Sequence, residues 1–314
     1  MEELRTDLLI IGAGPGGLGA ALYARRAGLD FVIVEKNMAG GQIINTELVE
    51  NYPGLKDGIT GFELAQSLAE HCRSLDVEIL EYHPIGSIEK IDHEAGGKRY
   101  SFKCTGSEKV ISSRALIIAT GAKPDRLNVK GETRLLGKGI SFCATCDGAL
   151  YREKEVAVIG GGDTAVEEAL FLTNLVKKVH LIHRRDELRA CDMLQCRAKE
   201  NKKIEFIWSS IVEEFIGDEK LEAVIIKNKN DGSTRKLKVG AVFEYVGLQP
   251  NSEVIKDLVN TDEKGFVITD TTMKTSHEGI YAIGDVRATP LRQVITAVSD
   301  GAVASMYVDK YFLE

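Results

Sequence analysis

Two segments of the chain repeat one succession of buried strand, glycine-rich turn and helix. In the first, residues 8–11 are all apolar, a glycine-rich turn follows at residues 12–17, and a helix is expected to run to about Gly28. A second apolar run at residues 31–34 completes the segment. Short uninterrupted apolar runs are typical of strands buried on both faces of a parallel sheet. The pattern therefore predicts a β-α-β unit.

The second copy of this unit spans residues 156–182. It has an apolar strand, the turn G-x-G-x-x-A, an expected helix over residues 166–175, and a second apolar strand. Placing Gly12 on Gly160 brings all four parts into register. The chain thus contains the same unit twice, which predicts an α/β protein with two Rossmann-like domains built on parallel sheets.

Both turns have the composition of a dinucleotide-binding loop. The first glycine permits the tight turn, the second lets the backbone approach a pyrophosphate, and the third position lets helix and strand pack. The helix N-terminus then offers N–H groups to the phosphates. A glycine-rich turn without a ligand is the alternative, and the flanking strand and helix favour the nucleotide site. The expected phosphate-binding residues are Gly12, Gly14, Pro15 and Gly17 in the first copy and Gly160, Gly162, Asp163, Thr164 and Ala165 in the second.

The two copies differ at the ribose end. Glu35 closes the first copy, where a carboxylate can accept hydrogen bonds from free ribose hydroxyls. The superposed position of the second copy is His183, followed by Arg184, Arg185 and, one helical turn on, Arg189. Guanidinium groups bind a ribose phosphate that a carboxylate would repel. We therefore expect the second site to prefer NADPH over NADH, the alternative being a solvated basic helix start.

The remaining pattern predicts the elements around these units. They are helices over residues 63–75, 189–199 and 293–311, the last interrupted by Gly301; strands over 77–80, 115–119, 204–208, 221–227, 237–240, 243–247 and 279–283; and an antiparallel meander over 86–114 with a turn at Gly96-Gly97. The polar, turn-rich segment over residues 123–139 and the segment over residues 248–251 are the expected links between two domains.

Composition restricts the classes of function. At 314 residues the chain is long enough for about two domains. Its formal net charge of -7 argues against nucleic acid or an anionic membrane as the main partner. No basic segment precedes the first apolar run, and residues 8–24 are too rich in glycine for a membrane span, so a cytoplasmic protein is expected. Six cysteines are too few for a secreted disulfide scaffold of this length.

Cys143 and Cys146 form a C-x-x-C pair followed directly by Asp147. Beside a β-α-β unit in a cytoplasmic chain, such a pair is typical of a redox couple. On a short helix beginning near Ser141, the first thiol would lie at the positive end and be the more acidic. Asp147 would act as an acid toward a departing thiolate, or would simply cap a helix.

A zinc site is the alternative for this pair. Its other half would be Cys191 and Cys196, which are about 140° apart around a helix of 3.6 residues per turn and cannot easily face one ion. The cysteines outside the C-x-x-C pair are therefore interpreted as unpaired thiols; they are Cys72, Cys104, Cys191 and Cys196.

Taken together, these motifs resemble the low-molecular-weight, bacterial-type NADPH-dependent thioredoxin reductases, which are flavoprotein disulfide reductases. The resemblance covers nearly the whole chain. The segments that carry it are the first glycine turn, Gly41-Gln42, residues 50–54, residues 119–121, the hexapeptide 143–148, His183-Arg184-Arg185, Gly284-Asp285 and Arg292-Gln293.

The resemblance implies how the two domains are divided. Residues 1–117 and 247–314 would form a discontinuous FAD domain, and residues 118–246 an inserted NADPH domain that carries the dithiol. It also implies a homodimer. Besides the first glycine turn and Glu35, the residues expected to bind FAD are Lys36, Gly41, Gln42, Asn51, Thr120, Asp285, Arg292, Gln293 and Val294.

The implied activity is the reduction of thioredoxin. Electrons would pass from NADPH to FAD and on to the disulfide, with Cys146 facing the flavin and Cys143 attacking the disulfide of thioredoxin. Because the dithiol and the nicotinamide must reach the same flavin alternately, the hypothesis includes a rotation about links near residues 117–122 and 247–251. Alternatives are the same fold serving another dithiol carrier or fed by ferredoxin, and a non-catalytic NADPH or thiol sensor.

Three places depart from the family pattern. They are Ala149 and Leu150 after the redox hexapeptide, Glu244 and Tyr245 in a strand expected to be apolar, and Val298, Ser299 and Asp300 in the last helix. The sequence alone gives no reason for them.

Overall fold

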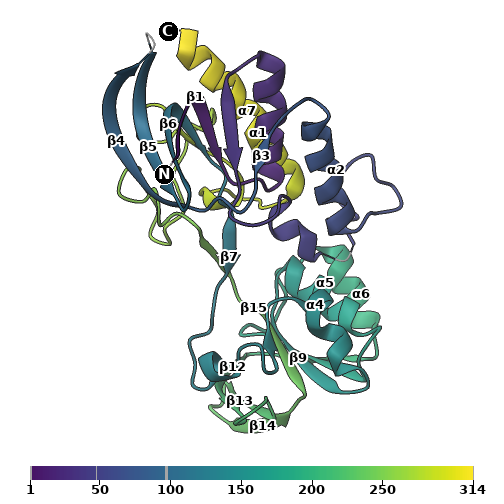
Figure 1. Cartoon of the computed structure of the whole chain (residues 1–314). Helices are drawn as coiled ribbons and strands as arrows, with labels where there is room; N and C mark the ends of the chain where they lie inside the picture. Colours follow the sequence, from purple (N-terminus) through teal and green to yellow (C-terminus); the bar gives the residue numbers. More distant parts are fainter. Residues whose placement is uncertain (1, 47, 96–97, 314) are drawn as a thin grey trace. The chain divides into compact units, whose positions relative to one another are not determined.

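The computed structural model describes residues 2–46, 48–95 and 98–313 (Figure 1). The chain divides into two compact units, unit 1 with residues 1–123 and 249–314 and unit 2 with residues 124–248. Each unit contains a sheet with parallel strands and helices, so the predicted α/β fold class is confirmed. The turn predicted at Gly96-Gly97 lies outside the described residues. Within the described part of the chain, no helix is long and apolar enough to cross a membrane.

The first glycine turn belongs to the sheet of unit 1, whose strand order is β3-β2-β1-β6-β5-β4, with β17 pairing with β6. The strands are β1 (Glu2–Ile11), β2 (Phe31–Val34), β3 (Ile79–Leu80), β4 (Ile85–Ala95), β5 (Lys98–Gly106), β6 (Lys109–Ile118) and β17 (Ile280–Ala282). The helices are α1 (Pro15–Ala27), α2 (Gly61–Arg73) and α7 (Val294–Leu313), with short 3-10 turns η1 (Gly41–Asn45) and η3 (Gly284–Val286).

Local sequence accounts for the limits of α1. Pro15 occupies the first turn, where its missing N–H and fixed φ cost nothing. Gly28 ends the helix in the left-handed region at φ 75° and donates its N–H to the carbonyl of Arg25. The expected helix end near Gly28 is confirmed.

The strand β6 joins two elements that the sequence predicts separately. The last strand of the predicted meander and the buried strand over residues 115–119 form one continuous strand, Lys109–Ile118. Its first half pairs with β5, and its second half pairs with β17, which arrives from the far end of the sequence. Both halves pair with β1, which is therefore longer than the four-residue apolar run.

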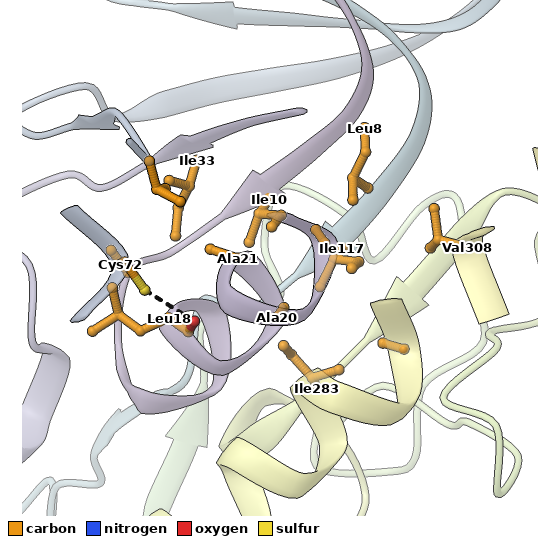
Figure 2. Packing of buried hydrophobic residues seen from close by; sticks show 14 of the residues in the cluster. Leu8, Ile10, Leu18, Ala20, Ala21, Ile33, Cys72, Ile117, Ile283 and Val308 are labelled. Atoms are coloured by element: carbon orange, nitrogen blue, oxygen red, sulfur yellow. Dashed lines mark hydrogen bonds between the residues drawn. The ribbon is translucent and has the colours of Figure 1, made fainter. Parts of the chain in front are cut away.

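Helices cover one face of this sheet, and the rest of unit 1 covers the other. Leu8 and Ile10 point into a core shared with α1 and α7, as Figure 2 shows. Leu9 and Ile11 point the other way, into a core shared with β5 and β6. Opposite orientation of neighbouring side chains explains why the run is apolar at every position.

The predicted interruption of the last helix at Gly301 is wrong. The helix α7 runs unbroken through this glycine and packs along α1. A Cβ at Gly301 would lie 2.6 Å from the backbone nitrogen of Ala20 and would overlap the carbonyl oxygen of Gly16. Gly301 is therefore a contact point between two helices, where only a hydrogen fits.

Unit 2 repeats the arrangement around the second glycine turn, with the all-parallel order β11-β10-β9-β15-β8. These strands are β8 (Ile140–Ser141), β9 (Glu155–Gly160), β10 (Lys178–Ile182), β11 (Ile204–Ile207) and β15 (Ala241–Tyr245). Helices α4 (Ala144–Asp147), α5 (Asp163–Leu172) and α6 (Asp192–Glu200) lie on one face, with a 3-10 turn η2 (Gly148–Tyr151) after α4. The other face packs on α3 (Glu132–Leu135) and on an antiparallel sheet of β12 (Ser210–Ile216), β13 (Ala223–Asn228) and β14 (Thr234–Lys238).

Several predicted limits in unit 2 differ from the structure. The redox helix begins at Ala144 because residues 140–141 pair with β15. The helix α5 ends at Leu172, and α6 begins at Asp192 because residues 184–191 form a loop that returns to the glycine turn. The strand β12 has no counterpart in the prediction.

The two segments that link the units pair with each other. They are β7 (Ala122–Pro124) and β16 (Leu248–Pro250). Beside this pair, the Thr120 hydroxyl donates to the carbonyl of Asn251 over 2.7 Å, and the Asn251 amide donates to the carbonyl of Thr120 over 2.9 Å. Thr120, a predicted cofactor residue, thus holds the outgoing and returning segments together.

Candidate functional site

The first glycine turn leaves no room for side chains where a dinucleotide phosphate would approach. A side chain at Gly17 would overlap the carbonyl oxygen of Gly12, and one at Gly41 would meet Gly14 at 2.9 Å. Gly12 and Gly41 both have positive φ, at 108° and 66°. The turn and η1 therefore bring two backbone segments close together at the start of α1, a fit for a pyrophosphate.

Glu35 at the end of β2 is already tied to the turn. One carboxylate oxygen accepts the N–H of Ala13 over 2.8 Å, and the other accepts the N–H of Asn37 over 3.0 Å. Each oxygen keeps a second lone pair for a ribose hydroxyl. The neighbouring Lys36 is exposed.

Tertiary structure brings predicted FAD residues from the two halves of unit 1 into contact. The Asn51 amide donates to the Gln293 side chain over 3.1 Å, although these residues lie far apart in sequence. The Arg292 guanidinium stacks on the Phe266 ring at 4.1 Å and donates to the carbonyl of Arg287 over 3.2 Å. Gln42 lies in η1, and Val294 is the first residue of α7.

Asp285 lies in η3 beside two charged groups. Burial raises the pKa of its carboxyl, Arg292 lowers it, and Asp300 raises it. Asp300 departs from the family pattern, and the sequence alone gives no reason for it. In the structure its buried carboxylate accepts the N–H of Gly284 over 3.0 Å and pairs with the Arg287 guanidinium over 3.1 Å. Asp300 therefore fixes the turn that presents Asp285, a role that no local pattern reveals.

The His183 imidazole packs against the second glycine turn at Gly161. A side chain at Gly161 would overlap the His183 imidazole, and the ring also packs edge-to-face on Trp208. Burial, followed by the charges of nearby arginines, lowers the pKa of His183. The structure thus places a buried imidazole against the turn, apart from the exposed arginines.

Three of those cations are exposed on the loop that follows β10; they are Arg184, Arg185 and Arg189. The loop returns to the turn because the N–H groups of Arg189 and Ala190 both donate to the carbonyl of Gly161, over 2.7 and 3.2 Å. Asp163, the first residue of α5, accepts the N–H of Cys191 over 2.7 Å. This arrangement keeps the arginines near the turn, where a ribose phosphate would lie. The other predicted residues of the turn are Gly160 at the end of β9, Gly162 before α5, and Thr164 and Ala165 within α5.

The two thiols of the C-x-x-C pair form a disulfide, Cys143–Cys146, at the start of α4. Cys143 precedes the helix, and its sulfur accepts the N–H of Cys146 over 3.2 Å. It therefore lies at the positive end of the turn, as the sequence predicts. Asp147 makes no side-chain cap to the η2 turn that follows, so the capping alternative has no support at that turn.

The other cysteines differ in exposure. Cys72 and Cys104 are buried, and burial raises their pKa to about 11 and about 12. The Cys72 thiol donates to the carbonyl of Leu18 over 3.3 Å (Figure 2). Cys191 and Cys196 are exposed, at the start of α6 and within it.

Two dinucleotide-type turns and a C-x-x-C disulfide define a class of protein, the pyridine-nucleotide-dependent disulfide oxidoreductases. Residues 6–301 match the family model described as pyridine nucleotide-disulphide oxidoreductase. A thioredoxin reductase from Listeria innocua is 44% identical over 314 residues, which is 100% of this chain and 96% of that protein.

Solved structures agree with this class. The thioredoxin reductase of Lactococcus lactis has a TM-score of 0.92 and 42% identity, with 98% of this chain and 99% of that chain covered. The enzyme of T. acidophilum has a TM-score of 0.91 and 34% identity, with 99% of each chain covered. The chain belongs to the pyridine nucleotide-disulphide oxidoreductases and, within them, to the thioredoxin reductases. It is an NADPH-dependent flavoprotein oxidoreductase that uses FAD.

Proposed function

We propose that this chain is an NADPH:thioredoxin-disulfide reductase in which unit 1 binds FAD and unit 2 binds NADPH. The observation that carries the proposal is the Cys143–Cys146 disulfide, which lies in the same unit as the second glycine turn and its arginines. The full-length likeness to proteins named thioredoxin reductase supports thioredoxin as the partner.

The proposed nucleotide-binding residues are those that the sequence motifs and the family resemblance predict, and the contacts above support part of each set. The FAD set comprises Gly12, Gly14, Pro15, Gly17, Glu35, Lys36, Gly41, Gln42, Asn51, Thr120, Asp285, Arg292, Gln293 and Val294. The NADPH set comprises Gly160, Gly162, Asp163, Thr164, Ala165, His183, Arg184, Arg185 and Arg189, with His183 acting as a support for the turn. Bound FAD supplies the two-electron transfer between the nicotinamide and the disulfide.

The chain's own residues then carry out thiol–disulfide exchange. The Cys143 thiolate attacks the partner's disulfide and forms a mixed disulfide, and Cys146 attacks Cys143 to release the reduced partner. Two electrons leave the dithiol, and Cys143–Cys146 is restored. Asp147 donates the proton to the departing thiolate. The position of Cys143 before the first turn of α4 favours its thiolate.

The paired segments β7 and β16 are proposed as the pivot between the units. They are the places where the chain passes from one unit to the other. A two-stranded ribbon can twist without breaking either core, so rotation there would let the dithiol and the nicotinamide use one flavin in turn.

The proposal also includes a cytoplasmic location and a homodimer. The proposed dimer interface is an exposed hollow between α1 and α7 that is lined by residues including Tyr23 and Met306.

The test is Cys143→Ser in the FAD-loaded protein. NADPH should still bleach the flavin absorbance, whereas steady-state reduction of thioredoxin should fall to background, because the attacking thiol is absent. The matched control is Cys196→Ser, an exposed cysteine on α6 that should leave both measurements unchanged.

Loss of flavin bleaching and of thioredoxin reduction together in Cys143→Ser would contradict the assigned order of electron flow. A wild-type protein that oxidises one equivalent of NADPH and then stops in the presence of thioredoxin would favour the sensor alternative. Turnover with reduced ferredoxin and none with NADPH would favour the ferredoxin-fed alternative.

A further inference from the structure

Tyr245 reaches the redox helix from a neighbouring strand. It is the last residue of β15, and its hydroxyl accepts the backbone N–H of Ala144 over 3.0 Å. Ala144 is the first residue of α4, directly after Cys143, and it is 0% exposed. Since water does not reach this amide, the tyrosine hydroxyl takes the place of water as its acceptor.

The backbone of the same tyrosine abuts the second glycine turn. Tyr245 is the register partner of Gly160 in the β15–β9 ladder. A Cβ at Gly160 would lie 2.5 Å from the Tyr245 carbonyl oxygen. One residue therefore contacts the nucleotide turn with its main chain and the redox helix with its side chain.

The first turn of α4 is held differently in its two redox states. In the disulfide form, the covalent bond closes the turn between Cys143 and Cys146. The N–H of Asp147 also donates to the carbonyl of Cys143 over 3.2 Å. Two-electron reduction with uptake of two protons opens the covalent ring and gives two thiols. In the reduced state the covalent bond no longer restrains the turn, so its conformation depends more strongly on the hydrogen bond from Ala144 to Tyr245.

We propose that Tyr245 is a positioning residue for the dithiol, whose hydroxyl holds the first turn of α4 in place when the disulfide opens and so favours the reduced form. The inference rests on the redox role proposed for Cys143 and Cys146. It concerns the balance between their two states and requires no contact between Tyr245 and either substrate.

The contact between Tyr245 and Ala144 does not change with pH, because the hydroxyl stays protonated. Burial raises the pKa of Tyr245 far above its usual value. The carboxylates of Glu168 and Asp147 raise it further, and the hydrogen bond from Ala144 offsets part of the rise. Because the hydroxyl does not titrate over the working pH range, it accepts the Ala144 N–H in the same protonation state throughout that range. Its effect on the couple should therefore be the same at pH 6 and pH 8.

The experiment compares Tyr245→Phe with wild type as FAD-loaded full-length protein. Each is equilibrated in dithiothreitol redox buffers, and Cys143 and Cys146 are counted by alkylation and mass spectrometry. We expect the dithiol/disulfide constant to fall about tenfold, which is about 30 mV toward more negative potential. Amide exchange at Ala144 should be faster in the reduced variant than in reduced wild type, with a smaller difference between the oxidised forms.

Tyr151→Phe is the matched control. Tyr151 lies in η2, just after α4, and its ring packs edge-to-face on Phe243 at 6.2 Å. This variant also loses a tyrosine hydroxyl near the redox helix, but its ring contact is kept. Its potential should equal that of wild type.

Equal potentials and equal Ala144 exchange in wild type and Tyr245→Phe would overturn the inference, even if both redox forms of the variant melt at a lower temperature. A shift of the same size in Tyr151→Phe would overturn it as well. A wild-type protein whose Cys143–Cys146 disulfide cannot be reduced by NADPH would contradict the proposed function, whereas the first two outcomes contradict this inference alone.

Discussion

Glu244 is a carboxyl group inside the core of unit 2. Its side chain is 0% exposed. Burial, and then the nearby carboxylate of Glu132, raises the pKa of Glu244 to about 8. A backbone hydrogen bond with Leu127 and the charge of Arg126 offset part of this rise. The folded protein therefore holds a proton on Glu244 at pH values where the unfolded chain has lost it.

This difference makes stability depend on pH. A glutamate in an unfolded chain has a pKa of about 4.3, so the free energy of unfolding should fall between about pH 4.5 and pH 8 and level off above that. Glu244→Gln does not titrate. Its stability relative to wild type should rise by on the order of 2 to 4 kcal/mol from pH 5 to pH 8.5.

Urea unfolding followed by the fluorescence of Trp208 measures this effect, because Trp208 is the only tryptophan of the chain and lies in unit 2. Glu219→Gln, an exposed position before β13, is the control and should run parallel to wild type. A constant difference between Glu244→Gln and wild type across this pH range would show that Glu244 does not titrate in the folded state as expected.

Arg184 and Arg185 allow a second prediction at the residue scale. Replacing both with alanine should raise the KM for NADPH by roughly a hundredfold and leave the KM for NADH nearly unchanged, because charge-assisted hydrogen bonds contribute about 1.5–3 kcal/mol each. Steady-state kinetics with both cofactors measure the change. Arg152→Ala removes an exposed arginine elsewhere in unit 2 and should change neither value. Equal increases for both cofactors would remove the case for a phosphate site.

At the scale of elements, the crossing of α1 and α7 depends on Gly301. Alanine usually stabilises an open helix by about 1 kcal/mol over glycine. Here the added methyl would meet the backbone of α1, which cannot yield as a flexible side chain would. Gly301→Ala should therefore lower the free energy of unfolding by about 1–3 kcal/mol.

Thermal unfolding of the full-length protein with bound FAD tests this prediction. Flavin fluorescence follows the unfolding of unit 1, the proposed FAD-binding unit. Ala302→Gly is the control at the next position of α7, and its cost should be only that of helix propensity, about 1 kcal/mol. An increase in stability in Gly301→Ala would mean that the two helices can separate to admit a methyl group.

The elements also show where sequence patterns succeed and fail. The strand-turn-helix-strand units are predicted well because glycine, proline and apolar runs act within a few residues of one another. The sequence pattern predicts two separate strands where the structure has the single strand β6, because the two halves pair with different neighbours, β5 and β17, and local sequence does not encode that pairing. The predicted helix interruption at Gly301 is wrong for the same reason, since this glycine contacts a different helix, α1.

At the scale of the whole molecule, the hollow between α1 and α7 gives the proposed homodimer a testable surface. Met306 is 49% exposed in its wall. Met306→Glu would place a charge against an apolar contact, so we expect the dimer to dissociate into chains of 34.4 kDa. Sedimentation equilibrium measures this mass. Leu313→Glu, an exposed apolar position at the end of α7, is the control, and an unchanged mass for Met306→Glu would exclude this surface.

The sequence by itself determined the two nucleotide-type turns, the difference in charge at their ribose ends and the redox pair with Cys143 before its helix, because each of these is a short-range pattern with one chemical reason. Only the tertiary structure decided which distant residues act on those sites. Asp300 reaches Gly284, Asn51 meets Gln293, and Tyr245 reaches Ala144 through the packing of separate elements. A polar contact of this kind depends on where two chain segments meet, and the local sequence around either partner does not predict it.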